Sequence, residues 1–223
     1  MKAEAQVSYR VVLDPRHQTK LYPEILNMPV RKVHKKMGES FEKGDILIEL
    51  EDGVLKTNYQ RAEAEVARTM TQLDAIKKLH EDKISSNYEL RNAESEYKKS
   101  VAELAMAMKN LEATKIKAPY KGKVEDVYIE EYELPKEEHE LIELVDDQVL
   151  IARLLVTSDL LPKLYEGKPI VIAVQEIGEN VEAKIKRIGA MIDPSSSTIK
   201  IEAEIDNRDG RLKAGMIGRV TIE

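Results

Sequence analysis

The sequence predicts an α+β fold that is mainly β, with an α-helical coiled-coil hairpin inserted into one of two β modules. Three features support this prediction. A short segment occurs twice at a fixed offset, a stretch with helical periodicity separates the two copies, and β-branched runs follow the second copy. Each copy is too short to hold a core alone, so we expect the two copies to interlock into one small sandwich.

The repeat relates residues 30–52 to residues 124–146 without a gap. Both copies alternate short apolar runs with turns, which is the period-two pattern of β-strands. In the first copy Gly38 and Gly44 mark tight turns, where glycine can adopt a positive φ. The second copy has Tyr132 and Glu138 there, so we expect its turns to be built differently. The identical positions include Val30 with Val124, Val33 with Val127, and Leu47-Ile48-Glu49-Leu50 with Leu141-Ile142-Glu143-Leu144.

Residues 54–114 have apolar side chains three and four positions apart, as in a coiled coil. The pattern breaks at residues 82–86, and Ser86 with Glu89 predicts a capping box that starts a second helix. Two helices of about 28 residues give a rod roughly 40 Å long. Such a length favours reach towards a partner. The expected seam is Leu55, Tyr59, Ala62, Val66, Thr69, Leu73 and Ile76, then Leu90, Tyr97, Val101, Leu104, Met108 and Leu111.

From about residue 149 the sequence is again β, which predicts a small barrel or sandwich. A short helix is expected at residues 158–165, with Ser158 as its N-cap and Gly167 as its stop. The N-terminal strand, residues 7–13, could pair with this second module. The other strands are expected at residues 150–156, 170–175, 181–188, 198–205 and 217–222.

Composition excludes several classes of function. The net charge of −6 argues against nucleic-acid binding, which needs clustered positive charge. The chain has no cysteine, and its four histidines are far apart in the sequence, so we expect no metal site and no cofactor. Met106 and Met108 could suggest a soft-metal path, but a packing role is favoured.

No motif marks an active site, so we expect a protein that is not an enzyme. No stretch is long and apolar enough to span a membrane and no signal peptide is visible, so the chain as given is expected to be soluble, its anchor removed or never present.

Three stretches resemble motifs of one known family. Residues 37–52 (MGESFEKGDILIELED) resemble V-G-D-x-V-x-K-G-x-x-L, and residues 116–124 (IKAPYKGKV) resemble I-x-A-P-F-x-G-x-V. Residues 189–223 resemble the end of a β-barrel domain, with residues 212–216 (LKAGM) in place of L-x-P-G-M and Ala214 replacing proline. In order and spacing these stretches resemble the periplasmic adaptor, or membrane fusion protein, family of the haemolysin-D type.

The resemblance implies a division into five segments. Residues 1–20 would be an N-terminal strand that joins a β-barrel. Residues 21–53 and 115–147 would be the halves of a lipoyl-like domain, with residues 54–114 as the hairpin between them. Residues 148–223 would form the barrel. The family usually continues into a membrane-proximal domain, whereas this chain stops at Glu223.

The resemblance also implies a function. The protein would link an inner-membrane transporter, with the proton-driven RND type favoured, to an outer-membrane channel. It would act in the periplasm as a homo-oligomeric ring, anchored to the inner membrane by a segment absent from this chain. One alternative is a lipoyl- or biotin-type carrier domain, although neither Asp-Lys-Ala nor Met-Lys-Met occurs at a hairpin tip. The other is a structural coiled-coil protein without a role in transport.

The resemblance names candidate docking residues at the hairpin tip. Adaptors of proton-driven pumps share an Arg-x3-Leu-x6-Ser pattern that meets the outer-membrane channel. Leu79 and Ser85 would be the equivalents here, with one residue fewer between them. The arginine position falls on Ala75, although Lys77 and Lys78 lie nearby.

Overall fold

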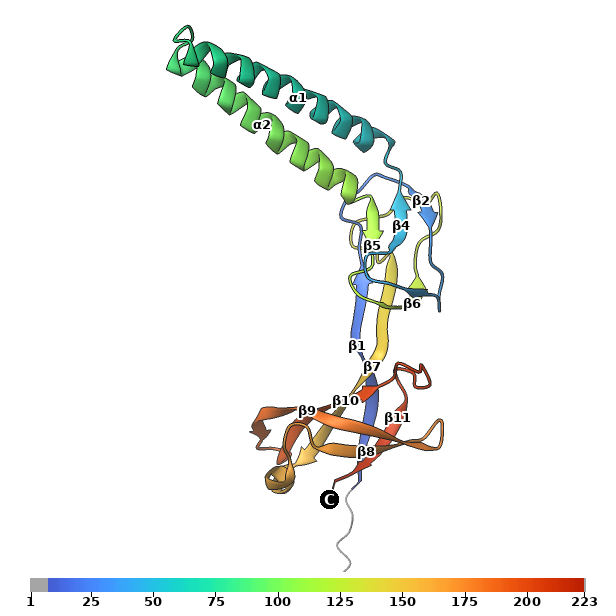
Figure 1. Cartoon of the computed structure of the whole chain (residues 1–223). Helices are drawn as coiled ribbons and strands as arrows, with labels where there is room; N and C mark the ends of the chain where they lie inside the picture. Colours follow the sequence, from blue (N-terminus) through green and yellow to red (C-terminus); the bar gives the residue numbers. More distant parts are fainter. Residues whose placement is uncertain (1–7, 223) are drawn as a thin grey trace, which may run out of the picture.

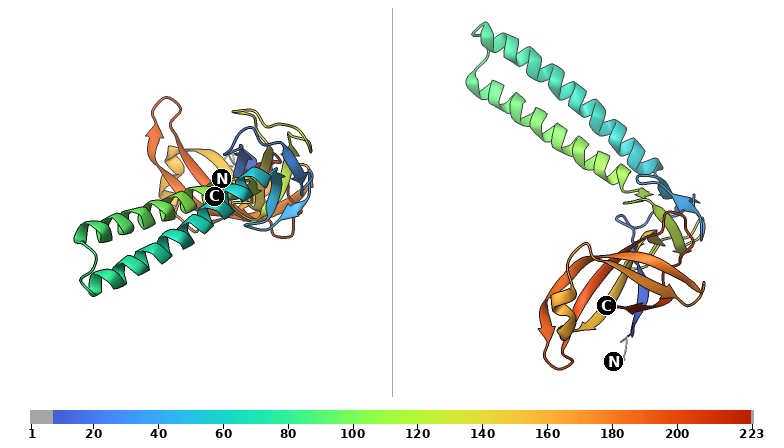
Figure 2. Two further views of the ribbon diagram at one scale, coloured as in Figure 1. Left: turned by 90° about the horizontal axis from the view of Figure 1, so that it is seen from above. Right: turned by 60° about the horizontal axis from the view of Figure 1, so that its bottom comes forward.

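The computed structural model describes residues 8–222 and places a helical hairpin, a small β module and a β-barrel in a row (Figure 1). Two further views show the same elongated arrangement (Figure 2). The mainly β fold with an inserted helical hairpin is confirmed. The elements are β1 (Ser8–Leu21), β2 (Val30–Val33), β3 (Ser40–Phe41), β4 (Ile46–Leu50), α1 (Gly53–Glu81), α2 (Asn87–Glu112), β5 (Lys115–Lys117), β6 (Gly122–Val127), β7 (Ile142–Thr157), the 3₁₀ helix η1 (Ser158–Lys163), β8 (Pro169–Val174), β9 (Glu179–Asp193), β10 (Thr198–Asp206) and β11 (Ile217–Thr221).

The barrel is a closed ring of antiparallel strands. Its strands follow the order β1, β11, β8, β9, β10 and β7, and β1 pairs with β7 to close the ring. Alternating side chains of these strands point inwards and form one continuous aliphatic core, which includes Leu13, Leu150 and Ile172. Of the expected N-terminal strand, Val7 lies outside the described residues, and the following residues pair with β11 from Ser8 onwards.

Two long strands join the barrel to the β module above it. β1 and β7 pair from Val12 opposite Arg153 to Leu21 opposite Ile142, with an irregularity between Pro15 and His17. The sequence predicted a separate strand from residue 150, whereas β7 continues unbroken through polar residues 146–148. Asp146 pairs with His17 of β1, whereas Asp147 and Gln148 lie at the irregularity, where their carbonyls accept hydrogen bonds from the side chain and the backbone amide of Asn207. The expected boundary between residues 147 and 148 therefore falls inside β7.

In the β module the two repeat copies exchange equivalent hydrogen bonds. The Gly38 amide donates to the Val124 carbonyl at 2.8 Å, and the Tyr132 amide donates to the Val30 carbonyl at 2.7 Å. Each bond therefore has its counterpart at the repeat offset, as a pseudo-twofold relation between the copies requires. The core draws Leu47 and its repeat partner Leu141 into one cluster. The two copies interlock, as expected.

The turns of the second copy correct a prediction. Gly38 and Gly44 have φ values of 82° and 90°, and their counterparts Tyr132 and Glu138 have φ values of 71° and 63°. The second copy thus keeps the same left-handed turns with residues that have a Cβ. Such a conformation costs roughly 1–2 kcal/mol per residue. At Tyr132 the hydrogen bond to Val30 holds the backbone in place.

The hairpin projects from the junction between β4 and β5, which pair with each other. The seam expected on α1 lies towards α2 with Leu55, Thr69 and Leu73 buried. On α2 the prediction was wrong at Val101 and Met108, which are 41% and 49% exposed. The buried positions of α2 are the small residues Ala93 and Ser100, which let the helices approach closely. The other predicted seam residues of α2 are half-buried; they are Leu90, Tyr97, Leu104 and Leu111. At the middle of the seam the buried hydroxyls of Thr69 and Ser100 lie 2.7 Å apart and share a hydrogen bond.

The short helix after β7 is also different from the prediction. Residues 158–163 form a 3₁₀ helix preceded by Thr157, and no side chain caps its N-terminus. Pro162 lies inside it. Because proline has no backbone N–H, an α-helix could not continue through this position with its full set of hydrogen bonds.

Candidate docking site at the hairpin tip

The turn at the hairpin tip is held by backbone hydrogen bonds to the last turn of α1. The amides of Ile84 and Ser85 both donate to the Leu79 carbonyl, at 2.8 Å and 3.2 Å. Lys83 adopts a positive φ of 62°, which reverses the chain direction. The two residues named as candidates from the sequence, Leu79 and Ser85, are thus brought together at the end of the rod.

The second side of the turn is fixed by the predicted capping box. The Ser86 amide donates to the Glu89 carboxylate at 2.7 Å, and the Glu89 amide donates to the Ser86 hydroxyl at 3.2 Å. The bond from the Ser86 backbone lowers the pKa of Glu89, and the bond from its hydroxyl adds to this. Glu89 therefore keeps its charge at neutral pH and holds the start of α2.

Ser85 itself faces back towards α1. Its hydroxyl donates to the Ile76 carbonyl at 3.4 Å, and the His80 ring nitrogen Nδ1 lies 3.1 Å from its carbonyl oxygen. Ser85 is consequently half-buried. Its side chain supports the shape of the turn, and its outer surface remains accessible.

The most exposed apolar side chains of the tip are Ile84 and Tyr88. They are 71% and 72% exposed, compared with 39% for Leu79. Reasoning from the sequence assigned neither residue a role, because neither belongs to the helical seam or to the family pattern. In the sequence they could have been recognised as large apolar side chains in or next to the break between the two predicted helices. Large exposed apolar residues grouped at one end of a thin rod are a typical protein-contact feature.

The structure also places the other residues that the sequence associated with the tip pattern. Ala75, Lys77 and Lys78 are exposed on the last turns of α1. In a carrier domain the cofactor lysine would lie at the turn between the two repeat copies, but in this chain the hairpin occupies that position. Within residues 8–222, no three His, Asp or Glu side chains converge in a way that could hold a metal ion. No helix in the same range is both long enough and apolar enough to cross a bilayer.

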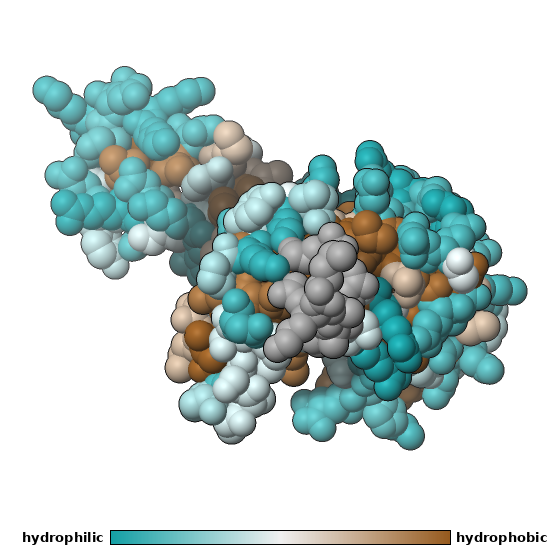
Figure 3. Space-filling view, turned by 90° about the horizontal axis from the view of Figure 1, so that it is seen from below, coloured by the Kyte–Doolittle hydropathy of each residue, from teal (hydrophilic) through white to brown (hydrophobic). Residues whose placement is uncertain are grey.

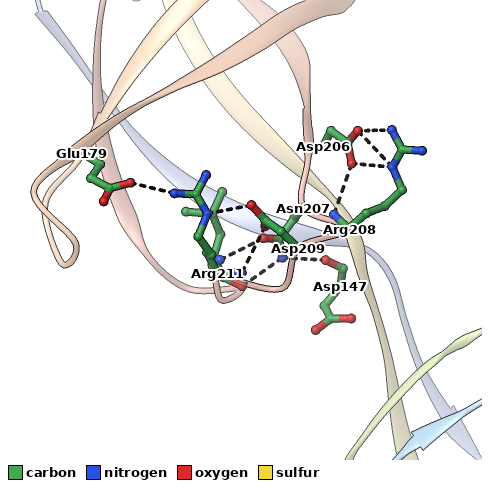
Figure 4. A network of polar contacts seen from close by, with 8 residues as sticks. Asp147, Glu179, Asp206, Asn207, Arg208, Asp209 and Arg211 are labelled. Carbon is green, nitrogen blue, oxygen red and sulfur yellow. Dashed lines mark hydrogen bonds and ion pairs between the residues drawn. The ribbon is translucent and has the colours of Figure 1, made fainter.

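A polar network joins the loop after β10 of the barrel to strand β7 (Figure 4). The buried Asn207 amide donates to the carbonyls of Asp147 and Leu212 at 2.8 Å and 2.9 Å. The Asp147 carboxylate in turn contacts Lys123 of β6 at 2.6 Å. The loop after β10 is thereby linked, through Asp147, to the module that carries the hairpin.

At the edge of this network, arginine side chains lower the pKa values of two aspartates and so stabilise their ionised forms. The Arg208 guanidinium, which contacts the Asp206 carboxylate, lowers the pKa of Asp206 to about 2. Arg211 lowers the pKa of Asp209 and also contacts Glu179 at 3.0 Å. These groups lie on the barrel surface, far from the hairpin tip, and we assign them a structural role.

Comparisons with known proteins agree with this architecture. Residues 156–223 match the family model of the CusB-like β-barrel domain. An uncharacterized protein of Haemophilus influenzae is 27% identical over 195 residues, which cover 86% of this chain and 51% of the relative. The chain therefore spans about half the length of the curated relative it matches.

Solved structures with similar folds include a membrane fusion protein, a chimera of MacA and MexA, and a MacA protein. A MacA–MexA chimera that contains the Pseudomonas aeruginosa MexA α-hairpin has a TM-score of 0.80 at 21% identity, over 97% of this chain and 82% of its own. A membrane fusion protein from Streptococcus pneumoniae has a TM-score of 0.75 at 16% identity, over 97% and 98%. MacA from Actinobacillus actinomycetemcomitans has a TM-score of 0.69 at 20% identity, over 97% and 78%.

These likenesses extend over nearly the whole chain and include its hairpin, its β module and its barrel. The resemblance expected from the sequence motifs is therefore confirmed. The chain has the fold of the membrane fusion proteins, or periplasmic adaptors, with a CusB-like β-barrel domain at its C-terminal end.

Proposed function

We propose that this protein is the periplasmic adaptor of a tripartite efflux pump and links an inner-membrane transporter to an outer-membrane channel. The observation that carries the proposal is the rigid hairpin with exposed apolar side chains at its far end. α1 has 29 residues, which corresponds to about 44 Å at 1.5 Å per residue. A thin rod of this length places its tip well away from the β modules, where a second protein can contact it.

The remaining parts of the proposal rest on the resemblance to the membrane fusion protein family. The barrel and the β module would lie side by side with their copies in a homo-oligomeric ring, and the hairpins would point towards the outer membrane. The β modules would meet the transporter, for which we favour the proton-driven RND type. The protein would act in the periplasm, anchored to the inner membrane. Its role is architectural, without catalysis and without a cofactor or metal.

The docking surface is proposed to consist of Leu79, Ser85, Ile84 and Tyr88. Ile84 and Tyr88 would supply most of the buried apolar area, because they are the more exposed in the isolated chain. Leu79 and Ser85 would contact the channel at the base of these two side chains. A protein contact of this kind is expected to depend on a few buried apolar or aromatic anchors.

Site-specific cross-linking tests the proposed contact. A photo-reactive amino acid is placed at position 84 at the tip, or at position 106 on the shaft as a control, where Met106 is 62% exposed. The proposal predicts a cross-link between position 84 and an outer-membrane channel protein in cells, and none from position 106. Cross-links from position 84 that contain only copies of this chain would contradict it. They would favour a structural coiled-coil protein without a role in transport.

A further inference from the structure

Two arginines lie directly opposite each other on the outer face of the barrel. Arg10 of β1 is the register partner of Arg219 of β11, and both side chains are exposed. Side chains of directly opposite residues in an antiparallel pair are close neighbours, and like charges in such a pair repel each other. The electrostatic part of this pairing becomes favourable when a negatively charged group lies between the two guanidinium groups.

The other arginines of the barrel are neutralised by carboxylates. Arg153 contacts Asp14 at 2.5 Å, and Arg187 contacts Glu202 at 3.0 Å. Arg16 likewise contacts Glu204, Arg208 contacts Asp206, and Arg211 contacts both Asp209 and Glu179. Among residues 8–222, no carboxylate oxygen lies within 4.0 Å of the guanidinium nitrogens of Arg10 or Arg219. The opposed pair thus differs from the rest of the barrel.

The space beside the two arginines is lined by hydrogen-bond donors. A shallow hollow of about 430 Å³ is bounded by Ser8, Arg10, Gln175 and Arg219. All four side chains can donate hydrogen bonds, and none is acidic. Guanidinium groups form paired, charge-assisted hydrogen bonds with oxyanions, and phosphate oxygens fit their planar geometry. We propose that this hollow binds a phosphate-class oxyanion between Arg10 and Arg219, with Ser8 and Gln175 as further donors.

The position of the hollow indicates two sources for such an anion. Ser8 pairs with Thr221, so the hollow lies where β1 begins and β11 ends. Figure 1 shows these strand ends at the end of the molecule opposite the hairpin, and Figure 3 views the molecule from that end. A free phosphate or phosphomonoester could enter from solvent. An anionic phospholipid headgroup could be bound if this end faces the inner membrane, and only that source rests on the proposed function. The chemistry of the site is the same for both.

A titration with inorganic phosphate tests the site directly. Binding is followed through the arginine side-chain Nε–Hε resonances of the full chain, at constant ionic strength with chloride as the balancing anion. We expect shifts at Arg10 and Arg219 that saturate, and no such shift at Arg187. Arg219→Gln should weaken phosphate binding about tenfold or more, because charge-assisted hydrogen bonds are lost. Unsaturable or uniform shifts across all arginines would overturn the proposal.

Thermal unfolding supplies a second readout that does not depend on resonance assignment. Phosphate should raise the melting temperature of the parent chain, because a ligand that binds only the folded state stabilises it. In Arg219→Gln this rise should disappear, while the melting temperature without phosphate should increase as the repulsion is relieved. Arg187→Gln is the matched control and should keep the phosphate effect. Equal phosphate effects in the parent and both variants would count against the site.

Vesicle sedimentation then distinguishes the two sources. The parent chain is mixed with vesicles of phosphatidylglycerol and phosphatidylcholine, or of phosphatidylcholine alone. Because the net charge of the chain is −6, unspecific attraction to anionic vesicles is not expected. Binding to the anionic vesicles that is lost in the Arg10→Gln/Arg219→Gln variant would assign a lipid headgroup. Phosphate binding without vesicle binding would assign a free anion. Vesicle binding that persists in the double variant, with no phosphate response, would contradict the proposal.

Discussion

The hairpin and the β modules of this chain are built by different means. The barrel and the β module each enclose a cluster of fully buried aliphatic side chains, whereas the hairpin buries only a narrow seam. The β modules therefore hold their shape through interior packing. The hairpin holds its shape through its narrow apolar seam, the hydrogen bond between the Thr69 and Ser100 hydroxyls, and the capping box at the start of α2. The difference indicates that substitutions should destabilise the β modules most and the hairpin tip least.

A close backbone contact in the β module provides the largest expected effect. A Cβ at Gly122 would lie 2.2 Å from the Val145 carbonyl oxygen, which is main chain and cannot move aside freely. Gly122→Ala should therefore lower the free energy of unfolding by about 3 kcal/mol. Gly53→Ala at the start of α1 is the matched control, because nothing lies within 4 Å of its added Cβ. We expect the control to be neutral or more stable by up to about 1 kcal/mol in urea unfolding.

The seam of the hairpin should show a smaller effect that depends on pairing. Thr69→Val removes one of the two buried hydroxyls and leaves the Ser100 hydroxyl with only its bond to the Tyr97 carbonyl in its own helix. The expected loss of stability is about 1–2 kcal/mol. The double variant Thr69→Val/Ser100→Ala removes both polar groups and should recover part of this loss. Strictly additive losses in chemical unfolding of the single and double variants would show that the two hydroxyls are independent.

The junction between barrel and β module should respond to pH. Glu143 is buried and accepts hydrogen bonds from Tyr128 and Gln18, each at 2.6 Å, and the bond from Tyr128 is the main cause of its lowered pKa. The stability from a depressed carboxyl pKa is present above the ordinary value of 4.5 and is lost as the pH falls through the folded-state pKa. The same bond raises the pKa of Tyr128 to about 12, so its contribution also falls at strongly alkaline pH.

Glu143→Gln should isolate this contribution. At pH 7 the variant should be less stable than the parent by about 1.5 kcal/mol, because a charged acceptor is lost. The difference should shrink as the pH is lowered below 4.5, where the parent carboxyl becomes protonated. Urea midpoints of both proteins across this range provide the measurement. A difference that stays constant down to the acid limit would show that the Glu143 charge does not contribute.

Local signals in the sequence predicted more of the hairpin than of its surroundings. The capping box at Ser86 and Glu89 and the α1 seam were visible, because each depends on residues a few positions apart. The α2 seam was only partly visible, since Ala93 and Ser100 are chosen for size and do not stand out as apolar. The left-handed turns at Tyr132 and Glu138 were not visible either. At Tyr132 the conformation is held by a hydrogen bond to a strand about 100 residues earlier in the chain.

The candidate site was predicted in part for a similar reason. A family pattern directed attention to Leu79 and Ser85, and the structure joins them by a hydrogen bond. Whether these residues bind a channel stays a prediction. Ile84 and Tyr88 were not singled out, because exposure at the end of a turn depends on the geometry of the turn. The continuity of β7 was missed because residues 146–148 are polar, and because their partners, His17 and Asn207, lie far away in the sequence.

The smallest expected effect on folding belongs to the tip. Ile84→Asp and Leu79→Asp change exposed side chains, so each should alter the free energy of unfolding by no more than about 0.5 kcal/mol. Ser85→Arg is expected to cost somewhat more, because the Ser85 hydroxyl bonds to the Ile76 carbonyl. Melting curves of the three variants check this. A large loss for Ile84→Asp would show that the tip contributes to folding.

Efflux activity in cells that lack the native adaptor tests the central claim most directly. Drug susceptibility is measured for the parent, for the three tip variants and for Met106→Asp on the shaft, together with the melting curves. A charge placed in a packed contact costs several kcal/mol of binding energy, so the Ile84→Asp and Leu79→Asp proteins should fold and yet fail to restore resistance. Met106→Asp should restore it. If Ile84→Asp and Leu79→Asp restore resistance as fully as the parent, the tip is not the docking surface and the account is wrong.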